Sequence, residues 1–298
     1  MCSAALAVTE RVKVATAATN IHTRHPLLLA SMCSSLHSLS GGRFELGLAR
    51  GVAIRNQLMG LENVNNQQMV DGLTVLRTLW RGEKVMGYEG PLGQLPYLNM
   101  GDWLDADIPI YFVGFGEKSL AFAGQHFNGV HLHTFITPAG LGRVRKAIAE
   151  GATKANRNAA EIKICSVMAT LINPDRTAHL QKRVARMATY MQAPGYAEML
   201  VALNGWDPAV LTAFREHPLV SSMLGGIDSV ATLEQLEEIE QLIPSEWLAA
   251  AAVGSPEECA LRIQQEFGHG VDEVCIHAST PAEFAPVIDA YRALKNKG

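Results

Sequence analysis

The chain has 298 residues, enough for one large domain or two small ones. Its net charge of −4 gives no reason to expect nucleic acid or an anionic membrane as a partner, and no run approaches the roughly 18 apolar residues that span a bilayer. The five cysteines are odd in number, lack C-x-x-C spacing and accompany no signal peptide, which predicts a cytoplasmic protein with reduced thiols.

The predicted elements alternate along the chain, after residues 2–9, which resemble the end of a helix without an N-cap. Strands are expected at residues 12–20, 43–49, 108–114, 129–135, 162–171 and 271–278. Helices are expected at 26–39, 64–80, 118–126, 137–156, from Asn173-Pro174 onward, from Pro256 after the N-cap Ser255 to 267, and at 281–295. A polar loop follows Gly51, a hairpin is expected within 84–107, and 191–247 predicts short helices without strands.

Apolar strands that are each followed by a helix predict a parallel sheet covered by helices. An open dinucleotide-binding sheet would normally carry G-x-G-x-x-G after its first strand, and only the weaker Gly114-Phe115-Gly116 is present, after the third. A closed (β/α)₈ barrel needs eight strands at about 30 residues a unit, whereas six are recognised. Together with the uncapped first helix, this count predicts a TIM barrel that lacks roughly its first two β/α units.

Three motifs resemble the bacterial luciferase-like family. They are ATNIHTRHP at 18–26, LSGGRFELG at 39–47 and VGSPEEC at 253–259. Within that family they are most similar to the luciferase-like monooxygenase relatives that use coenzyme F420. The resemblance implies one (β/α)₈ TIM-barrel domain over residues 1–298, with a helical insertion at 191–247 before the last strand.

The resemblance also implies an activity. It predicts an F420-dependent oxidoreductase that passes hydride between a deazaflavin and a small organic substrate, with the coenzyme supplying the redox chemistry. Two alternatives remain open: an FMN-dependent monooxygenase of the same fold, and a truncated cofactor-binding remnant without turnover. Expected partners are a small-molecule substrate and a second copy in a homodimer, with no nucleic acid and no membrane.

Cofactor-binding residues are carried over position by position. Members of the family place a bulge with a non-prolyl cis peptide in the strand that matches 12–20, which puts Thr16, Ala17 and Thr19 behind the central ring of the coenzyme. Family members bind coenzyme backbone or phosphate at the loop after the third strand, which here comprises Val113, Gly114, Phe115, Gly116, Lys118 and Ser119. A helix N-terminus favours an anion there, although a tight glycine turn explains the same residues.

Arg50 follows the second strand, where some F420 enzymes of this type carry a glutamate proton donor just beyond. The matching position here is Val52, so that mechanism does not transfer. Arg50 and Arg55 are instead expected to pair with the acidic tail of the coenzyme or a substrate anion. A surface ion pair is the alternative.

His131 and His133, two apart on the fourth predicted strand, are expected to share one face. His133, nearer the carboxyl end, is the predicted catalytic residue, as proton donor or substrate contact, with a structural histidine as the alternative. No further ligands suggest a metal site. His25 is expected to start a helix, and His277 is a weaker candidate for the pocket.

Overall fold

The computed structural model describes residues 1–102 and 104–296. Its contacts divide the chain into two compact units. Unit 1 comprises residues 1–114, 122–131 and 154–157, and unit 2 comprises residues 115–121, 132–153 and 158 onward. The prediction of one domain over 1–298 stays a prediction.

The described chain contains mostly short strands and longer helices. Its strands are β1 (Val14–Ala15), β2 (Thr19–Asn20), β3 (Phe44–Ala49), β4 (Val85–Gly90), β5 (Gly93–Leu98), β6 (Ile110–Val113), β7 (Gly129–His131), β8 (Lys163–Ile172), β9 (Ala252–Gly254) and β10 (Glu273–His277). Its α-helices are α1 (Cys2–Ala7), α2 (Pro26–Leu39), α3 (Ala53–Leu58), α4 (Asn66–Trp80), α5 (Glu117–His126), α6 (Pro138–Lys154), α7 (Arg176–His179), α8 (Ala185–Gln192), α9 (Tyr196–Asn204), α10 (Pro208–Glu216), α11 (Pro218–Ser221), α12 (Ile227–Val230), α13 (Leu233–Glu240), α14 (Ser245–Leu248), α15 (Pro256–Gly268) and α16 (Pro281–Lys295). Short 3₁₀ turns lie at Ile21–Thr23 and Ala159–Glu161, and a π-helical turn lies at Leu180–Val184.

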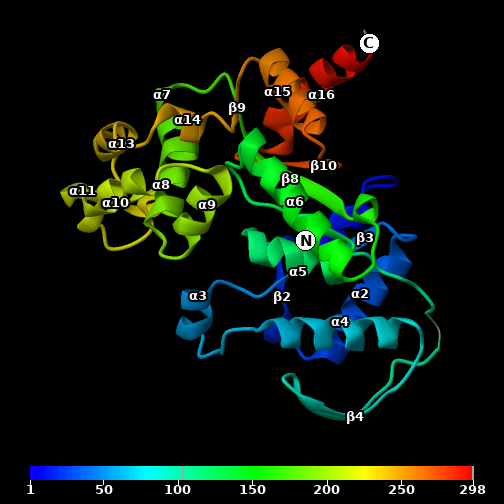
Figure 1. Ribbon diagram of the computed structural model, residues 1–298. Helices are drawn as coiled ribbons and strands as arrows, with labels where there is room; N and C mark the ends of the chain where they lie inside the picture. The colour runs from blue at the N-terminus through cyan, green and yellow to red at the C-terminus, as the bar shows by residue number, and fades with distance from the viewer. Residues whose placement is uncertain (103, 297–298) are drawn as a thin grey trace. The chain divides into compact units, whose positions relative to one another are not determined.

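Unit 1 contains a parallel sheet in which β1 and β2 both pair with β3, β3 pairs with β6, and β6 pairs with β7. Helices α2 and α4 pack against each other, and the buried indole of Trp80 donates to the carbonyl of Ala30 at 3.1 Å. The predicted hairpin is present as antiparallel β4 and β5, which lie beyond α4 in Figure 1. Parallel strands bring their carboxyl ends to one edge, where the candidate residues of this unit are found.

One extra residue separates β1 from β2. Ala15 lies opposite Glu45 and Thr19 lies opposite Leu48, so three residues, Thr16 to Ala18, face the two between Glu45 and Leu48. This is the predicted bulge. Its cis peptide joins Ala17 to Ala18, one residue later than predicted. The expected continuous strand over 12–20 is therefore wrong, because the bulge divides it into two short pieces.

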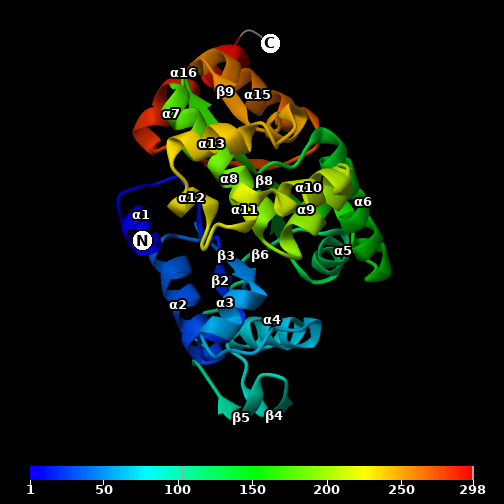
Figure 2. The same cartoon turned by 90° about the vertical axis from the view of Figure 1, so that its left-hand side faces the viewer.

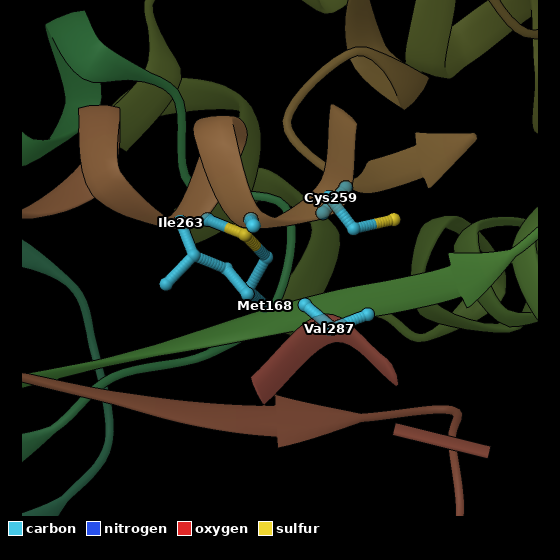
Figure 3. Packing of buried hydrophobic residues seen from close by; sticks show 6 residues of the cluster. Met168, Cys259, Ile263 and Val287 are labelled. Atoms are coloured by element: carbon cyan, nitrogen blue, oxygen red, sulfur yellow. The ribbon is translucent and has the colours of Figure 1, made fainter. Parts of the chain in front are cut away.

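Unit 2 holds β8, which pairs in parallel with β9 on one side and β10 on the other. Helices α15 and α16 lie side by side against these strands (Figure 1). Figure 3 shows their shared core, in which Met168 of β8 meets Cys259 and Ile263 of α15 and Val287 of α16. The four residues are almost entirely buried, so apolar contact holds the two helices on the sheet.

Short helices fill the middle of unit 2, as the sequence predicts. Helices α9 to α14 span 196–248, and α8 contacts both α9 and α10 (Figure 2). Trp206 and Trp247 stack with ring centroids 4.5 Å apart and nearly parallel planes. This segment precedes β9, a three-residue strand that the sequence analysis does not recognise because it is so short.

Three other expectations are wrong. The segment after Gly51 contains the short helix α3 rather than only a loop, because Asn56 bonds back to the carbonyl of Arg50 and continues the turn. Helix α7 begins at Arg176 with Asp175 as N-cap, since the Asp175 carboxylate accepts from Ala178, and Asn173 has a left-handed φ of 42°. Strand β7 ends at His131 instead of continuing to 135.

Side-chain caps begin two further helices, at Ser255 as predicted and at Thr280. Ser255 and Glu258 form a capping box at α15, and Thr280 caps α16. Helices α2 and α16 have the predicted bounds because each begins at a proline after a capping side chain. In the described chain, no helix combines the length and apolar character that crossing a membrane requires.

Candidate functional site

The carboxyl edge of the unit 1 sheet gathers several predicted residues. Thr19 and Asn20 lie opposite Leu48 and Ala49 at the end of β3, and Val113 at the end of β6 lies opposite His131. Active-site groups of parallel α/β barrels occupy this edge. Strand pairing alone therefore brings Thr19, Arg50 and Val113 to the carboxyl edge of the sheet. The sequence predicts all three as cofactor contacts.

Thr16 organises the bulge through its own hydroxyl. The hydroxyl donates to the carbonyl of Gly47 at 2.8 Å and accepts from the Gly47 N–H at 3.0 Å. A Cβ on Gly47 would lie 1.7 Å from the Thr16 carbonyl oxygen, so only glycine allows this approach. The Thr16 side chain is thus engaged by β3, and what the bulge offers to a ligand is the small surface of Ala17 and Ala18.

Arg50 combines a charge with an aromatic setting. Its guanidinium carbon lies 5.1 Å from the ring centroid of Phe112 and 5.0 Å from that of Phe122, and Nη2 donates to Asn66 at 2.6 Å. Burial lowers the pKa of Arg50, although a guanidinium stays charged at physiological pH. The contacts with Phe112, Phe122 and Asn66 hold this side chain in place. A cation held between aromatic rings at a strand end suits an anionic group of a ligand.

The loop from β6 to α5 provides backbone donors. The N–H of Gly114 donates to the His131 carbonyl at 3.0 Å, which anchors the start of the loop. Gly116 has a φ of +93°, which favours glycine, and α5 begins directly afterward at Glu117. The first turn of a helix carries N–H groups without helical acceptors. Lys118 is exposed and Ser119 half-buried in this turn, so the loop fits the predicted anion-binding role.

Phe115, in the same loop, has a different environment from the one predicted. Its ring is buried and contacts His133 at 5.3 Å and Tyr196 at 4.8 Å between centroids. Tyr190 contacts the same histidine at 4.3 Å, and Phe135 lies 6.3 Å from Tyr190. These five residues, Phe115, His133, Phe135, Tyr190 and Tyr196, are called the aromatic cluster below. All of them belong to unit 2.

His133 is the centre of this cluster and is uncharged. Burial lowers its pKa to about 3. Nδ1 lies 3.2 Å from the carbonyl oxygen of Thr134, and a carbonyl can only accept, so the proton is assigned to Nδ1. Nε2 then carries the lone pair and accepts hydrogen bonds. The ring is therefore neutral at neutral pH, and the catalytic role of His133 stays a prediction.

The two histidines predicted to share a face belong to different surroundings. His131 ends β7 and lies buried beside Tyr111 in unit 1, with a pKa lowered by burial. His133 lies beyond the strand. The N–H of Leu132 donates to the Cys165 carbonyl, and Phe135 then has a left-handed φ of 64°. Strand alternation therefore does not relate the two side chains, and the shared face stays a prediction.

Tyr190 and Tyr196 are site residues that the sequence analysis misses. Tyr190 lies in the last turn of α8, and Tyr196 begins α9 after the Pro194-Gly195 turn. Burial raises the pKa of both hydroxyls, so both remain protonated. The signal that could have revealed them is a pair of tyrosines flanking a turn, but nothing in that spacing indicates His133 as their partner.

The remaining candidates have structural explanations or no ligand-binding partners. His25 caps α2 by accepting from the Leu27 N–H at 3.2 Å, as predicted. Val52 and Arg55 are exposed at the start of α3. His277 ends β10, and burial lowers its pKa. Within residues 1–102 and 104–296, no group of three or more His, Cys, Asp or Glu side chains could hold a metal ion.

Comparison with known proteins adds relatives over nearly the whole chain. The 5,10-methylenetetrahydromethanopterin reductase of Methanolobus tindarius is 26% identical over 268 residues, covering 89% of this chain and 77% of that protein. An F420-dependent glucose-6-phosphate dehydrogenase of Beutenbergia cavernae is 25% identical over 287 residues, covering 92% and 74%.

Among solved structures, the coenzyme F420 dependent tetrahydromethanopterin reductase from Methanopyrus kandleri superposes with a TM-score of 0.74 at 20% identity, covering 96% of this chain and 83% of that one. This likeness shows an α/β fold of the luciferase-like barrel type. The model of the luciferase-like monooxygenase family matches residues 1–273. The chain therefore belongs to the luciferase-like monooxygenase family.

Proposed function

We propose that this protein is an F420-dependent oxidoreductase that moves hydride between coenzyme F420 and a small organic substrate. The observation that carries the proposal is the similarity to F420-dependent proteins over more than nine-tenths of the chain. When bound, the deazaflavin supplies the two-electron chemistry, and the protein positions it and manages protons.

The residues present fit an elongated anionic coenzyme. The bulge at Thr16 and Ala17, with Thr19 beside it, offers a surface of small side chains suited to a flat ring. Arg50 offers a cation, and the loop from Val113 to Ser119 offers backbone donors with Lys118. Within unit 1, the bulge is assigned to the ring of the coenzyme and Arg50 to an acidic group of its tail. The loop, whose residues from Phe115 onward belong to unit 2, is by itself assigned to an anionic group.

His133 is proposed as the group that contacts the reacting oxygen of the substrate. Its Nε2 accepts a hydrogen bond from a substrate hydroxyl, while Nδ1–H is retained by Thr134. A hydroxyl whose carbon loses hydride must also lose its proton. Because the pKa of His133 is about 3, that proton does not stay on the ring and passes on to solvent. In the reverse direction the proton arrives from solvent.

Fluorescence titration tests the proposal. Coenzyme F420 and FMN are added separately to the full chain, and we expect saturable quenching with F420 and none with FMN. Saturation by FMN alone would overturn the proposal in favour of an FMN-dependent monooxygenase, and absence of binding by both would favour a remnant without turnover.

Arg50→Gln sharpens the titration. Loss of one charged contact to the acidic tail should raise the dissociation constant for F420 about tenfold, since a charged hydrogen bond contributes about 1.5–3 kcal/mol before compensation. Arg81→Gln is the matched control, because Arg81 is exposed at the end of α4 and pairs with Glu83. Equal dissociation constants for the two variants would remove Arg50 from the proposed site.

A further inference from the structure

The side chains of the aromatic cluster in unit 2 differ in solvent exposure. Phe115 and Phe135 are buried, at 6% and 1% exposed, and form its base. His133, Tyr190 and Tyr196 each retain part of their surface. The burial that lowers the pKa of His133 is thus incomplete, and a partly accessible histidine with a strongly lowered pKa is typical of functional sites.

The contacts in the cluster are mostly edge to face. Tyr190 and Tyr196 meet His133 at interplanar angles of 79° and 84°, and Phe115 meets Tyr196 at 75°. Such packing fixes each ring through its neighbours. The cluster is therefore a rigid, largely apolar group of rings that carries three polar groups: the Nε2 acceptor of His133 and the two tyrosine hydroxyls, which stay protonated.

The titratable and charged groups around the aromatic cluster are paired or neutral. Arg186 lies with its guanidinium carbon 5.8 Å from the Tyr190 ring, and its Nη1 pairs with Asp228 at 2.8 Å. His277 and His133 both have lowered pKa values and are neutral. Neither Arg186 nor the two histidines offers an unpaired positive charge to a phosphate, so burying a doubly charged phosphate against these side chains is costly.

We propose that the aromatic cluster binds the substrate and selects an uncharged molecule that carries a flat or cyclic apolar group beside a hydroxyl, rather than a sugar phosphate. The inference rests on the proposed function. The apolar group packs on Tyr190 and Tyr196, and the hydroxyl donates to Nε2 of His133. Tyr196 is the residue that determines this specificity, because it contacts Phe115, His133 and Tyr190 together.

Saturation-transfer difference NMR on the full chain tests the inference with two probes, 1-phenylethanol and glucose 6-phosphate, each with and without F420. We expect transfer to 1-phenylethanol, strongest at its ring protons, and none to glucose 6-phosphate. Tyr196→Leu keeps an apolar side chain of moderate size, and it should weaken 1-phenylethanol binding roughly five- to tenfold. Tyr97→Leu is the matched control, since Tyr97 is exposed on the β4–β5 hairpin.

The outcomes separate the two proposals. Binding of 1-phenylethanol that depends on Tyr196 supports the aromatic cluster even if F420 fails to bind, in which case only the proposed function fails. Preferential binding of glucose 6-phosphate overturns the inference, and so does equal 1-phenylethanol binding by the Tyr196→Leu and Tyr97→Leu variants. If Tyr196→Leu melts well below the parent chain, Tyr196→Phe, which keeps the ring, should retain binding within about twofold. Loss of binding in that variant would also contradict the inference.

Discussion

The bulge in unit 1 and the aromatic cluster in unit 2 are both proposed ligand surfaces, but they are built in opposite ways. At the bulge, the backbone of Thr16 approaches Gly47 so closely that no side chain fits between them. In the aromatic cluster, side chains from a loop, a strand end and two helices create the surface around His133. An added side-chain atom should therefore destabilise the bulge strongly. Substitutions in the aromatic cluster should cost less stability and instead change which ligands it binds.

The largest expected effect is at Gly47. Gly47→Ala would place a Cβ 1.7 Å from the Thr16 carbonyl oxygen, so the two strands must separate, and we expect a loss of about 3 kcal/mol or more in the free energy of unfolding. Urea denaturation followed by circular dichroism measures it.

Gly142→Ala in α6 is the matched glycine substitution, because nothing lies within 4 Å of a Cβ there. It should stabilise the chain by about 0.5–1 kcal/mol through helix propensity. If Gly47→Ala lowers the free energy of unfolding by less than 1 kcal/mol, the approach of Thr16 to Gly47 does leave room for a side chain.

The next effect concerns acid stability and His133. Its pKa is about 3 in the folded chain, below the ordinary value of 6.5, so the unfolded chain binds the extra proton between these values. Folding stability from this group is present in full above pH 6.5 and is lost as the pH falls toward 3. Between pH 7.5 and 5 we expect the parent chain to lose about 1–2 kcal/mol more than His133→Asn, which cannot titrate.

Thermal denaturation of both proteins over this pH range provides the measurement. His269→Asn is a control for the loss of a histidine, because His269 is only half-buried, at the C-cap of α15. If the two histidine variants respond to pH alike, His133 is not held neutral by its surroundings.

The smallest effect is at the Tyr190 hydroxyl. Tyr190→Phe keeps the ring contact with His133 at 4.3 Å and removes the hydroxyl that bonds to Thr134. We expect a loss of about 1 kcal/mol in stability, as for one hydrogen bond, with the aromatic contacts preserved. Chemical denaturation gives the value. A loss above 3 kcal/mol would mean that the cluster, like the bulge, tolerates no substitution.

Much of the local structure could be predicted from residue patterns. Prolines after capping side chains predict α2, α15 and α16 at their observed starts, since a cap and its helix are neighbours in sequence. The family resemblance predicts the bulge, and its cis peptide lies one residue later than expected. Strand β9 and helix α3 were missed because three to six residues carry too little periodicity to distinguish them from loops.

The candidate site divides along the same line. By itself, the sequence determined the family motifs, the parallel character of the strands and the carboxyl edge where site residues gather, because each depends on residues close together in the chain. Only the tertiary structure decided that Phe115 and two tyrosines some 60 residues after His133 enclose its ring, and that this ring is neutral. Contacts between distant segments and the loss of water around a side chain arise from folding as a whole, and no local pattern encodes them.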